Sequence, residues 1–317
     1  MNPAFSVIFF TTLSGAGYGL LLWSAVAALA GWGRSWSPLA GVMLGLALAT
    51  VGLLSSLAHL GKPARAWRAF WQWRTSWLSR EGVMAVLTCV PALALAVVLL
   101  GAAIAAHPVT PAPHVVATRT VAALALIACT LATVYCTAMI YASLKPIPAW
   151  RHRAVVPVYL LFALLTGGLL CATLLAWDGG IGNGAAMAGI AGAIVLAIVK
   201  HRYWRDIDTT PLPMRRADAV GLPGRSVDVF ERPHTETNYL TREMGFVLAR
   251  RHARRLRQIA VMLFAVLPAL LLVPVWLFVH VDAAPWLAAA ALSALAGAGV
   301  ERWLFFAQAR HLVTLYY

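Results

Sequence analysis

Residues 5–30 read FSVIFFTTLSGAGYGLLLWSAVAALA, and none of these 26 positions carries a charge. A bilayer core of about 30 Å is crossed by about 20 mostly apolar residues in helical form, because no water is present there to bond free backbone groups. Seven further stretches have a similar composition: 38–60, 81–104, 119–142, 154–177, 184–200, 258–281 and 285–304. With 61% hydrophobic and 11% charged residues, the chain is predicted to be a single all-α integral membrane domain, 1–317, whose eight transmembrane helices form two four-helix bundles.

The basic residues are distributed unevenly between the two sides that these crossings define. All of the 25 Lys and Arg residues except Arg34 and Arg119 fall on the side of Met1. Without the long segment 200–257, ten basic residues still lie on that side against two on the other. The positive-inside rule therefore predicts that both termini are cytoplasmic. The net charge of +14 then follows from topology and favours anionic lipid, so we expect no nucleic-acid partner.

The cysteines and histidines do not suggest a metal cofactor in this chain. The four cysteines lie inside predicted spans and form no Cys-x-x-Cys pair, so an iron–sulfur ligand set is not supported. A b-type haem needs two axial histidines at facing depths inside spans, whereas the nine histidines lie in loops or at span ends. We therefore expect no haem and no iron–sulfur cluster here.

Two segments on the Met1 side are more elaborate than ordinary connections. Residues 61–80 mix basic side chains with tryptophans, a composition suited to a segment lying in the headgroup layer. The long cytoplasmic loop 201–257 ends in an amphipathic basic run. Two interpretations of this loop remain open: a solvated positive-inside loop, and a docking surface for a cytoplasmic partner subunit.

Ionisable residues at the edge of a membrane are costly to place there and are functional candidates by default. His59 closes the second predicted span and Glu81 opens the third, so a hairpin between the two helices brings them together. A histidine beside a carboxylate can bond a carbonyl oxygen and pass a proton, which a quinone requires when it is reduced or oxidised. The alternative is a satisfied polar pair, with Glu81 interacting with the helix dipole. Ser79 is expected to cap the third span.

The residues around this pair resemble a known family. Residues 59–66 read HLGKPARA, 76–81 read SWLSRE, and Tyr141 precedes the sequence PIPAW at 146–150. These motifs, with the eight-span layout, are similar to those of the membrane anchor subunits of dimethyl sulfoxide reductase-type molybdoenzymes. The resemblance implies an anchor in the bacterial inner membrane that binds ubiquinone or menaquinone. It also implies an iron–sulfur electron-transfer subunit as partner, which contacts a molybdopterin catalytic subunit.

The resemblance and the local chemistry together define a predicted site. The predicted catalytic residues are His59, as the main quinone ligand, and Glu81, as the proton relay. The full quinone-binding set is predicted to be His59, Gly61, Lys62, Arg65, Trp77, Ser79, Glu81 and Tyr141. For Tyr141 an ordinary role in the interfacial aromatic belt remains an alternative.

Orientation narrows the expected reaction. The family member dimethyl sulfoxide reductase keeps its catalytic subunits outside the cytoplasmic membrane, whereas the charge distribution places His59 of this chain on the cytoplasmic side. Since electrons must arrive from a nearby cluster, the partner subunits should be cytoplasmic as well. This arrangement resembles the anchor of cytoplasmic sulfite dehydrogenases, which oxidise sulfite to sulfate and reduce quinone.

Three alternatives remain open at this stage. The chain could anchor a reductase that oxidises quinol with dimethyl sulfoxide or another acceptor. It could be a transporter, although almost no ionisable residue is predicted at mid-depth. It could also be a passive anchor in which His59 and Glu81 are incidental.

Overall fold

The computed structural model describes residues 4–105, 111–179, 183–231, 252–278 and 280–315. Within these ranges, eight helices are long and apolar enough to cross a membrane. The expectation of an all-α membrane protein with eight spans is therefore confirmed.

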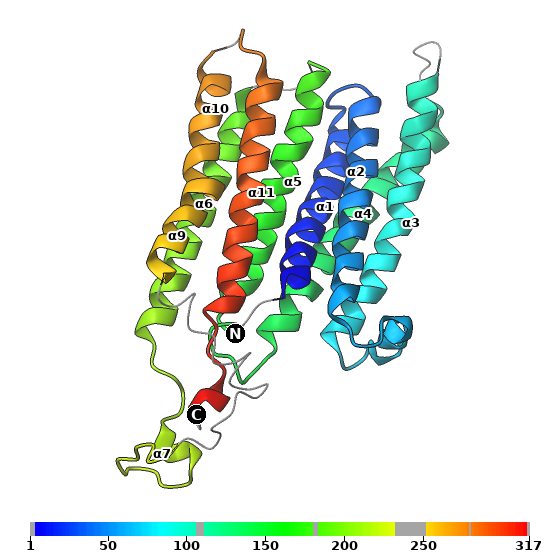
Figure 1. The fold of residues 1–317 in the computed structure, drawn as a ribbon. Coiled ribbons are helices and arrows are strands. Elements are labelled where there is room, and N and C mark those ends of the chain that lie inside the picture. The colour runs from blue at the N-terminus through cyan, green and yellow to red at the C-terminus, as the bar shows by residue number, and fades with distance from the viewer. Residues whose placement is uncertain (1–3, 106–110, 180–182, 232–251, 279, 316–317) are drawn as a thin grey trace.

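Figure 1 shows the spans side by side. The first six crossings are α1 (Phe5–Ala30), α2 (Trp36–Ser56), α3 (Trp77–Ile104), α4 (Pro113–Ala142), α5 (Val155–Trp177) and α6 (Asn183–Thr209). The seventh crossing is α9 (Ala253–Val261), the π-helical turn η4 (Met262–Val266) and α10 (Leu267–Leu277), and the eighth is α11 (Ala283–Ala307). The short elements are η1 (Leu57–His59), η2 (Pro63–Gln72), α7 (Arg216–Ala219) and η5 (Leu312–Leu315).

Several boundaries differ from those expected. α3 begins at Trp77 instead of residue 81, and α2 ends at Ser56, before the tighter turn η1. α6 continues to Thr209, so the expected loop 201–257 starts with two more turns of helix. Residues 232–251 of that loop lie outside the described ranges.

The grouping into two four-helix bundles is not confirmed, because α1 and α5 pack directly against each other at the centre of the molecule (Figure 1). A Cβ atom placed on Gly19 of α1 would overlap the backbone of Ala163 on α5, and one on Gly167 would overlap Gly19. Small residues allow membrane helices to approach this closely and to gain dispersion contacts that lipid cannot replace. α1 also contacts α2, α4 and α11, so it joins helices from both halves of the chain.

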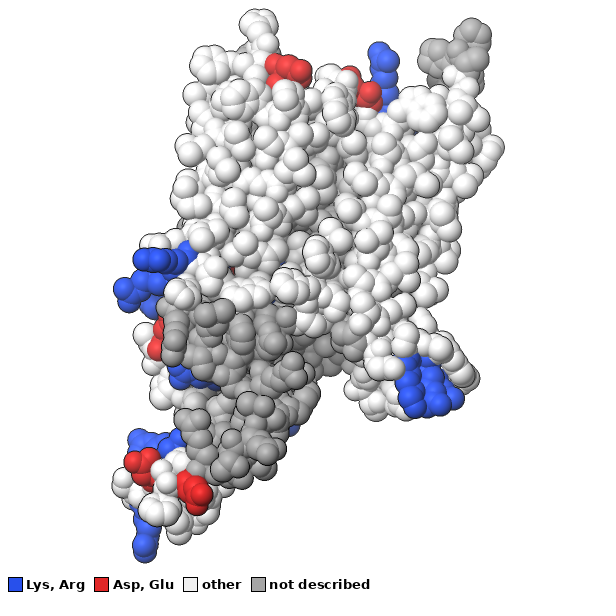
Figure 2. Space-filling view, viewed as in Figure 1, with Lys and Arg blue, Asp and Glu red and all other residues white. Residues whose placement is uncertain are grey.

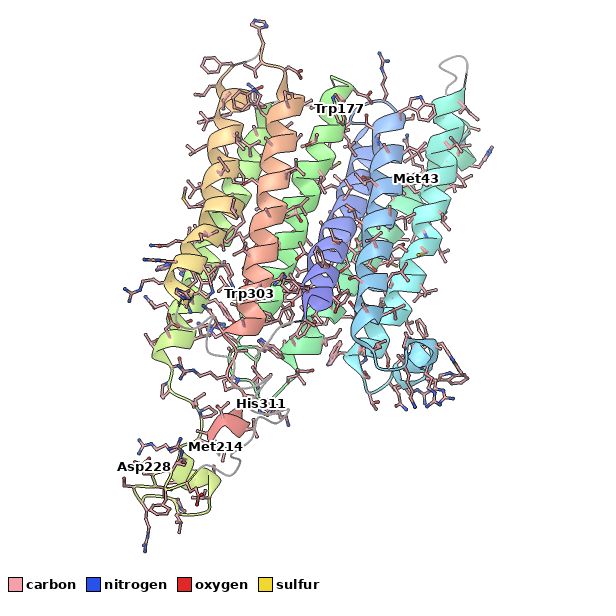
Figure 3. All side chains as sticks on the ribbon, viewed as in Figure 1. Met43, Trp177, Met214, Asp228, Trp303 and His311 are labelled. Atoms are coloured by element: carbon pink, nitrogen blue, oxygen red, sulfur yellow. The ribbon has the colours of Figure 1, made fainter. Side chains whose placement is uncertain are left out.

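The charged surface is concentrated at one end of the bundle. Figure 2 shows most of the visible Lys and Arg at the end that carries both termini and α7 in Figure 1. In Figure 3, His311 and Asp228 lie at or beyond this end, while Met43 and Trp177 lie toward the opposite end. η2 also lies at the charged end, so the motif-bearing segment and both termini share it.

Candidate functional site

The segment that connects α2 to α3 folds over the start of α3. Pro63, whose fixed φ suits a helix start, begins η2. The ring of Phe70 covers Gly82 on α3, where an added Cβ would lie 3.1 Å from the Phe70 Cε1 atom. The side chains of Trp67 and Trp71 are 56% and 76% exposed. We name residues 57–81 the hairpin segment.

The structure places the predicted site residues at different depths of the hairpin segment. Gly61, Lys62 and Arg65 are exposed. Ser79 and Glu81 are buried, and Trp77 is partly exposed. The hairpin segment thus combines exposed basic and aromatic side chains with a buried carboxylate at its end.

The backbone of His59 ends η1, directly before the exposed stretch. Its side chain lies outside the described part of the structure. The role of His59 as the main ligand therefore stays a prediction.

Glu81 is enclosed between α3 and α4. Its side chain is 3% exposed, and its Oε1 atom accepts a hydrogen bond of 2.5 Å from the Thr137 hydroxyl of α4. Because α3 begins four residues earlier than expected, Glu81 lies one full turn inside the helix and not at its opening. Burying a carboxylate is costly unless it is hydrogen-bonded, so the bond from Thr137 reduces the cost at this position.

The expected cap role of Ser79 is wrong. Ser76 is the N-cap of α3, and its hydroxyl accepts a long hydrogen bond of 3.4 Å from the Ser79 backbone N–H. Ser79 lies in the first turn with its side chain buried at 2% exposure. Ser76 directly precedes Trp77 and Leu78, whereas Ser79 is followed by Arg80 and Glu81 before the apolar run, and the sequence rule for caps accepts a serine at either place.

Trp77 is held by contacts on two sides. Its ring meets the edge of the Tyr135 ring with centroids 5.8 Å apart, and the Arg80 guanidinium lies 4.2 Å from the Trp77 centroid. Arg80 also donates hydrogen bonds of 3.0 and 2.7 Å to the carbonyl oxygens of Trp73 and Arg74. The end of the hairpin segment is thereby fixed to the first turn of α3.

Tyr141 lies in an aromatic cluster built from α4, α5, α11 and the turn after α4. Its ring centroid is 5.4 Å from that of Trp150, 6.0 Å from Tyr159 and 5.1 Å from Phe306. Trp150 in turn donates a hydrogen bond of 3.0 Å to the Phe305 carbonyl oxygen. These contacts describe a packing role, and the membership of Tyr141 in a quinone site stays a prediction.

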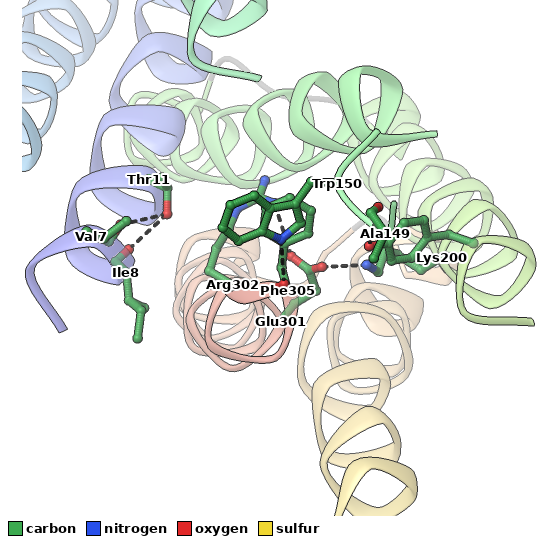
Figure 4. Close-up of polar contacts among 10 residues, drawn as sticks. Val7, Ile8, Thr11, Ala149, Trp150, Lys200, Glu301, Arg302 and Phe305 are labelled. Atoms are coloured by element: carbon green, nitrogen blue, oxygen red, sulfur yellow. Dashed lines mark hydrogen bonds and ion pairs between the residues drawn. The ribbon is translucent and has the colours of Figure 1, made fainter. Parts of the chain in front are cut away.

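Sequence reasoning missed a buried ionic cluster of Lys200, Glu301 and Arg302 (Figure 4). The three residues are at most 2% exposed, and Lys200 Nζ donates a hydrogen bond of 2.5 Å to Glu301 Oε1. Arg302 Nη1 lies 3.2 Å from Glu301 Oε2 without hydrogen-bond geometry. The Arg302 guanidinium also lies 3.6 Å from the centroid of the Tyr159 ring.

The sequence did contain an indication of this cluster. Glu301 and Arg302 follow each other inside the apolar stretch of the last span, where ionisable residues mark functional sites. Lys200 and Arg302 were counted only as charges at span ends that indicate the orientation. Glu301 was therefore left without a predicted partner. The pairing of α6 with α11 cannot be inferred from sequence spacing, because the two helices are far apart in the chain.

The donor set of the hairpin segment fits a quinone. Lys62 and Arg65 are exposed donors suited to a carbonyl oxygen, and the surrounding tryptophans offer flat apolar surface for a ring. Glu81, one turn inside α3 and adjacent to Gly82 on which Phe70 packs, is a group that can exchange a proton. Within the described residues, no three His, Cys, Asp or Glu side chains gather in a way that could hold a metal ion.

Comparisons with known proteins find similarity over nearly the whole chain. The family described as DMSO reductase anchor subunit (DmsC) matches residues 1–308. One of the sulfite dehydrogenase subunits of Allochromatium vinosum is 34% identical over 330 aligned positions, which cover 100% of this chain and 99% of that protein. The match thus extends over all eight spans and both the hairpin segment and the ionic cluster. This chain belongs to the DMSO reductase anchor subunit (DmsC) family.

Proposed function

We propose that this membrane anchor subunit of a molybdoenzyme binds a quinone at the hairpin segment. It would pass electrons between a partner iron–sulfur subunit and the membrane quinone pool. The observation that carries the proposal is the position of Glu81. A carboxylate buried to 3% exposure and hydrogen-bonded to Thr137 lies next to Gly82, on which Phe70 of the exposed basic and aromatic segment packs.

A quinone supplies a two-electron acceptor that also takes up two protons. The hairpin segment would bind it from the lipid, since the exposed rings of Trp67 and Trp71 are compatible with the headgroup layer. His59, with Lys62 or Arg65, would bond a carbonyl oxygen and fix the head group. Glu81 would hold a proton at its Oε2 atom while Oε1 stays bonded to Thr137.

We further propose that the electrons come from sulfite, oxidised to sulfate by a cytoplasmic molybdopterin subunit. Support comes from the relative named as part of a sulfite dehydrogenase, which aligns over the full length of this chain. The basic residues concentrated at the hairpin end support a cytoplasmic orientation of that end in the inner membrane. Partner subunits on this side would lie near the hairpin segment.

The experiment uses the complete complex, in which this chain is purified together with its iron–sulfur and molybdopterin partner subunits. Sulfite-driven reduction of quinone is measured in wild type, His59→Ala and Glu81→Gln, and a soluble dye that accepts electrons from the partner subunits serves as control. We expect each variant to lose about 10²-fold or more of the quinone rate, the size of a general acid–base contribution, with unchanged dye reduction. Quinone reduction at the wild-type rate in both variants would exclude the hairpin segment as the site.

A second candidate, a quinol-oxidising reductase, is favoured by the family description, which names DMSO reductase. The same complex distinguishes the two candidate functions, because a reductase oxidises quinol when dimethyl sulfoxide is added and leaves sulfite unchanged.

The proposed orientation in the membrane has an independent test. A C-terminal reporter active only in the periplasm should stay inactive, and its activity would reverse the proposed topology.

A further inference from the structure

The side chain of Thr137 is the hydrogen-bond donor that the structure gives to Glu81. Thr137 lies on α4 and is buried, and its hydroxyl oxygen is 2.5 Å from Glu81 Oε1. Among the described residues, no hydrogen bond reaches the other carboxylate oxygen, Oε2. The two oxygens of Glu81 therefore have different surroundings, and Oε2 is the one left to exchange a proton.

The same hydroxyl has a second acceptor. Its oxygen lies 3.1 Å from the backbone carbonyl oxygen of Thr133, one turn earlier in α4. A threonine hydroxyl carries one proton, so it donates to only one of the two acceptors at a time. Because a hydrogen bond to an ionised group is the stronger one, the proton points to Glu81 when the carboxylate is charged. When the carboxyl is neutral, the two acceptors are more nearly equal and the hydroxyl can turn to Thr133.

A second hydroxyl contact between α3 and α4 keeps these groups aligned. Thr88 lies two turns after Glu81 on α3, and its Oγ1 atom is 3.0 Å from Thr133 Oγ1. Both hydroxyls are buried and also bond a carbonyl oxygen of their own helix. Hydrogen bonds between membrane helices hold the two helices together. Thr137 is thus kept opposite Glu81 by a contact that does not involve either side chain.

The surroundings of Glu81 supply no compensating cation within the described part of the chain, where no ion pair includes Glu81. The titratable groups of the neighbouring helices that interact electrostatically with it are phenols and a thiol, neutral near pH 7: Tyr18 on α1, Cys136 and Tyr141 on α4, and Tyr159 on α5. α2 has no ionisable residue, and the arginines of η2 are exposed. Arg80 is bound to the Trp77 ring and to two carbonyl oxygens. The Thr137 hydroxyl is therefore the group that stabilises the charge of Glu81, because a buried carboxylate depends on its hydrogen bonds.

We propose that Thr137 is a positioning residue for proton transfer by Glu81. The proposal rests on the proposed quinone site and adds the residue that orients its acid. The Thr137 hydroxyl holds Oε1 of the ionised carboxylate, so that a proton from solvent binds at Oε2. Once the carboxyl is neutral, the Thr137 proton turns toward the Thr133 carbonyl oxygen. It returns to Oε1 when the Oε2 proton leaves for the quinone, and Thr137 keeps its own proton throughout.

The test measures quinone reduction by the complete complex as a function of pH in wild type and Thr137→Val. Valine keeps the shape of the side chain and removes the hydroxyl. Without its donor the ionised carboxylate is less favoured, so the neutral acid gives up its proton less readily. We expect about tenfold slower quinone reduction near pH 7, and a rise of about one unit in the pH at which the rate falls. Dye reduction and quinone affinity, measured by equilibrium binding to the oxidised complex, should stay at wild-type values.

Two control variants separate positioning from helix packing. Thr137→Ser keeps the hydroxyl and should retain the wild-type rate and pH profile. Thr88→Val makes the same substitution in the same helix interface, where it removes the contact with Thr133 and leaves the bond to Glu81. It should leave the pH profile unchanged. A shift of equal size in Thr88→Val would overturn the proposal, because loosening the contact between α3 and α4 would then be sufficient.

The Glu81→Gln background tests whether Thr137 acts through Glu81. A residue that acts only through another has no separate effect once that residue is replaced, so adding Thr137→Val should slow Glu81→Gln by less than about twofold. A further loss as large as that of Thr137→Val alone would contradict the positioning role, because Thr137 would then act independently of Glu81.

The outcomes separate this inference from the proposed function. If Glu81→Gln loses quinone reduction while Thr137→Val matches wild type in rate and pH profile, the positioning role is wrong and the quinone site stands. If the wild-type complex neither binds nor reduces quinone, both proposals are wrong. A loss of quinone affinity in Thr137→Val would also overturn the positioning role, because it would assign Thr137 to quinone binding.

Discussion

Two groups of ionisable residues toward the same end of the bundle differ in exposure and in pairing. Among the ionisable side chains of the hairpin segment that the structure describes, Lys62 and Arg65 are exposed and Glu81 is buried. In the ionic cluster, Lys200, Glu301 and Arg302 are all at most 2% exposed and contact one another. Exposed cations remain available to a ligand or a partner, whereas buried charges must be compensated from within the fold.

The first prediction tests this contrast through stability. Glu301→Met leaves two buried cations without a carboxylate and is expected to lower the free energy of unfolding by about 3–5 kcal/mol. Arg65→Met, at an exposed position, should change it by less than about 0.5 kcal/mol. Denaturant unfolding in mixed micelles measures both.

A double variant sharpens the same comparison. Glu301→Met combined with Lys200→Met replaces the ion pair by apolar side chains of similar volume and should recover part of the loss. Equal destabilisation by Glu301→Met and Arg65→Met would mean that Glu301 contributes no more to the free energy of unfolding than an exposed residue does.

The second prediction concerns the close contact between α1 and α5. Gly19→Ala places a methyl group against the Ala163 backbone and should cost about 1–3 kcal/mol. Gly101→Ala on α3 meets nothing within 4 Å and should be neutral or stabilising by about 0.5–1 kcal/mol. Thermal unfolding of both variants tests the α1–α5 contact, and indistinguishable midpoints would argue against it.

The third prediction concerns the start of α3 in the hairpin segment. Ser76→Ala removes the N-cap hydroxyl and should cost about 0.5–1 kcal/mol, the lower part of the usual range, because the bond is long at 3.4 Å. Ser79→Ala should cost less, since that side chain does not cap the helix. The reverse order in denaturant unfolding would restore Ser79 as the cap.

The smallest expected effect is at His311, beyond the last span. Burial lowers the pKa of His311, and its Nδ1 atom accepts a hydrogen bond of 3.0 Å from the Val313 backbone N–H. Folding therefore favours the neutral ring. The neutral His311 ring contributes its full stabilisation above the pKa of histidine in the unfolded chain, about 6.5. This stabilisation is lost as the pH falls from that value toward the lower pKa of the folded chain.

His311→Gln should remove this dependence. The unfolding midpoint is measured at about pH 7.5 and about pH 5.5, two values that bracket the histidine pKa, in both wild type and variant. The difference between the two midpoints is then compared between the two proteins. A wild-type difference that persists unchanged in the variant would assign the titration to another group.

Much of the fold follows from residue spacing and charge. Apolar stretches of span length predicted all eight crossings, because the requirement for internal backbone hydrogen bonds leaves few alternatives in lipid. The close contact of α1 with α5 could not be predicted, since glycines such as Gly19 occur in many spans without contacting a neighbour. Helix ends were displaced where a cap or a turn decided them, as at Ser76 and at η1.

The candidate site was predictable where its residues are close in sequence. Residues 59–81 form one connected segment, so a local motif was sufficient to identify it. Thr137 and the Lys200–Glu301 pair join helices that are distant in the chain, and local patterns contain no information on such pairs. Counting Lys200 and Arg302 as topological charges conceals their burial, because the positive-inside rule treats every basic residue near a span end alike.

The proposed function requires a quinone to bind at the hairpin segment. The most direct measurement is photocrosslinking of the complete complex with an azido-substituted quinone, followed by peptide mapping. We expect the label to attach within residues 57–81, to be displaced by unlabelled quinone and to be strongly reduced in His59→Ala. A displaceable label elsewhere in this chain, or in a partner subunit alone, would contradict it.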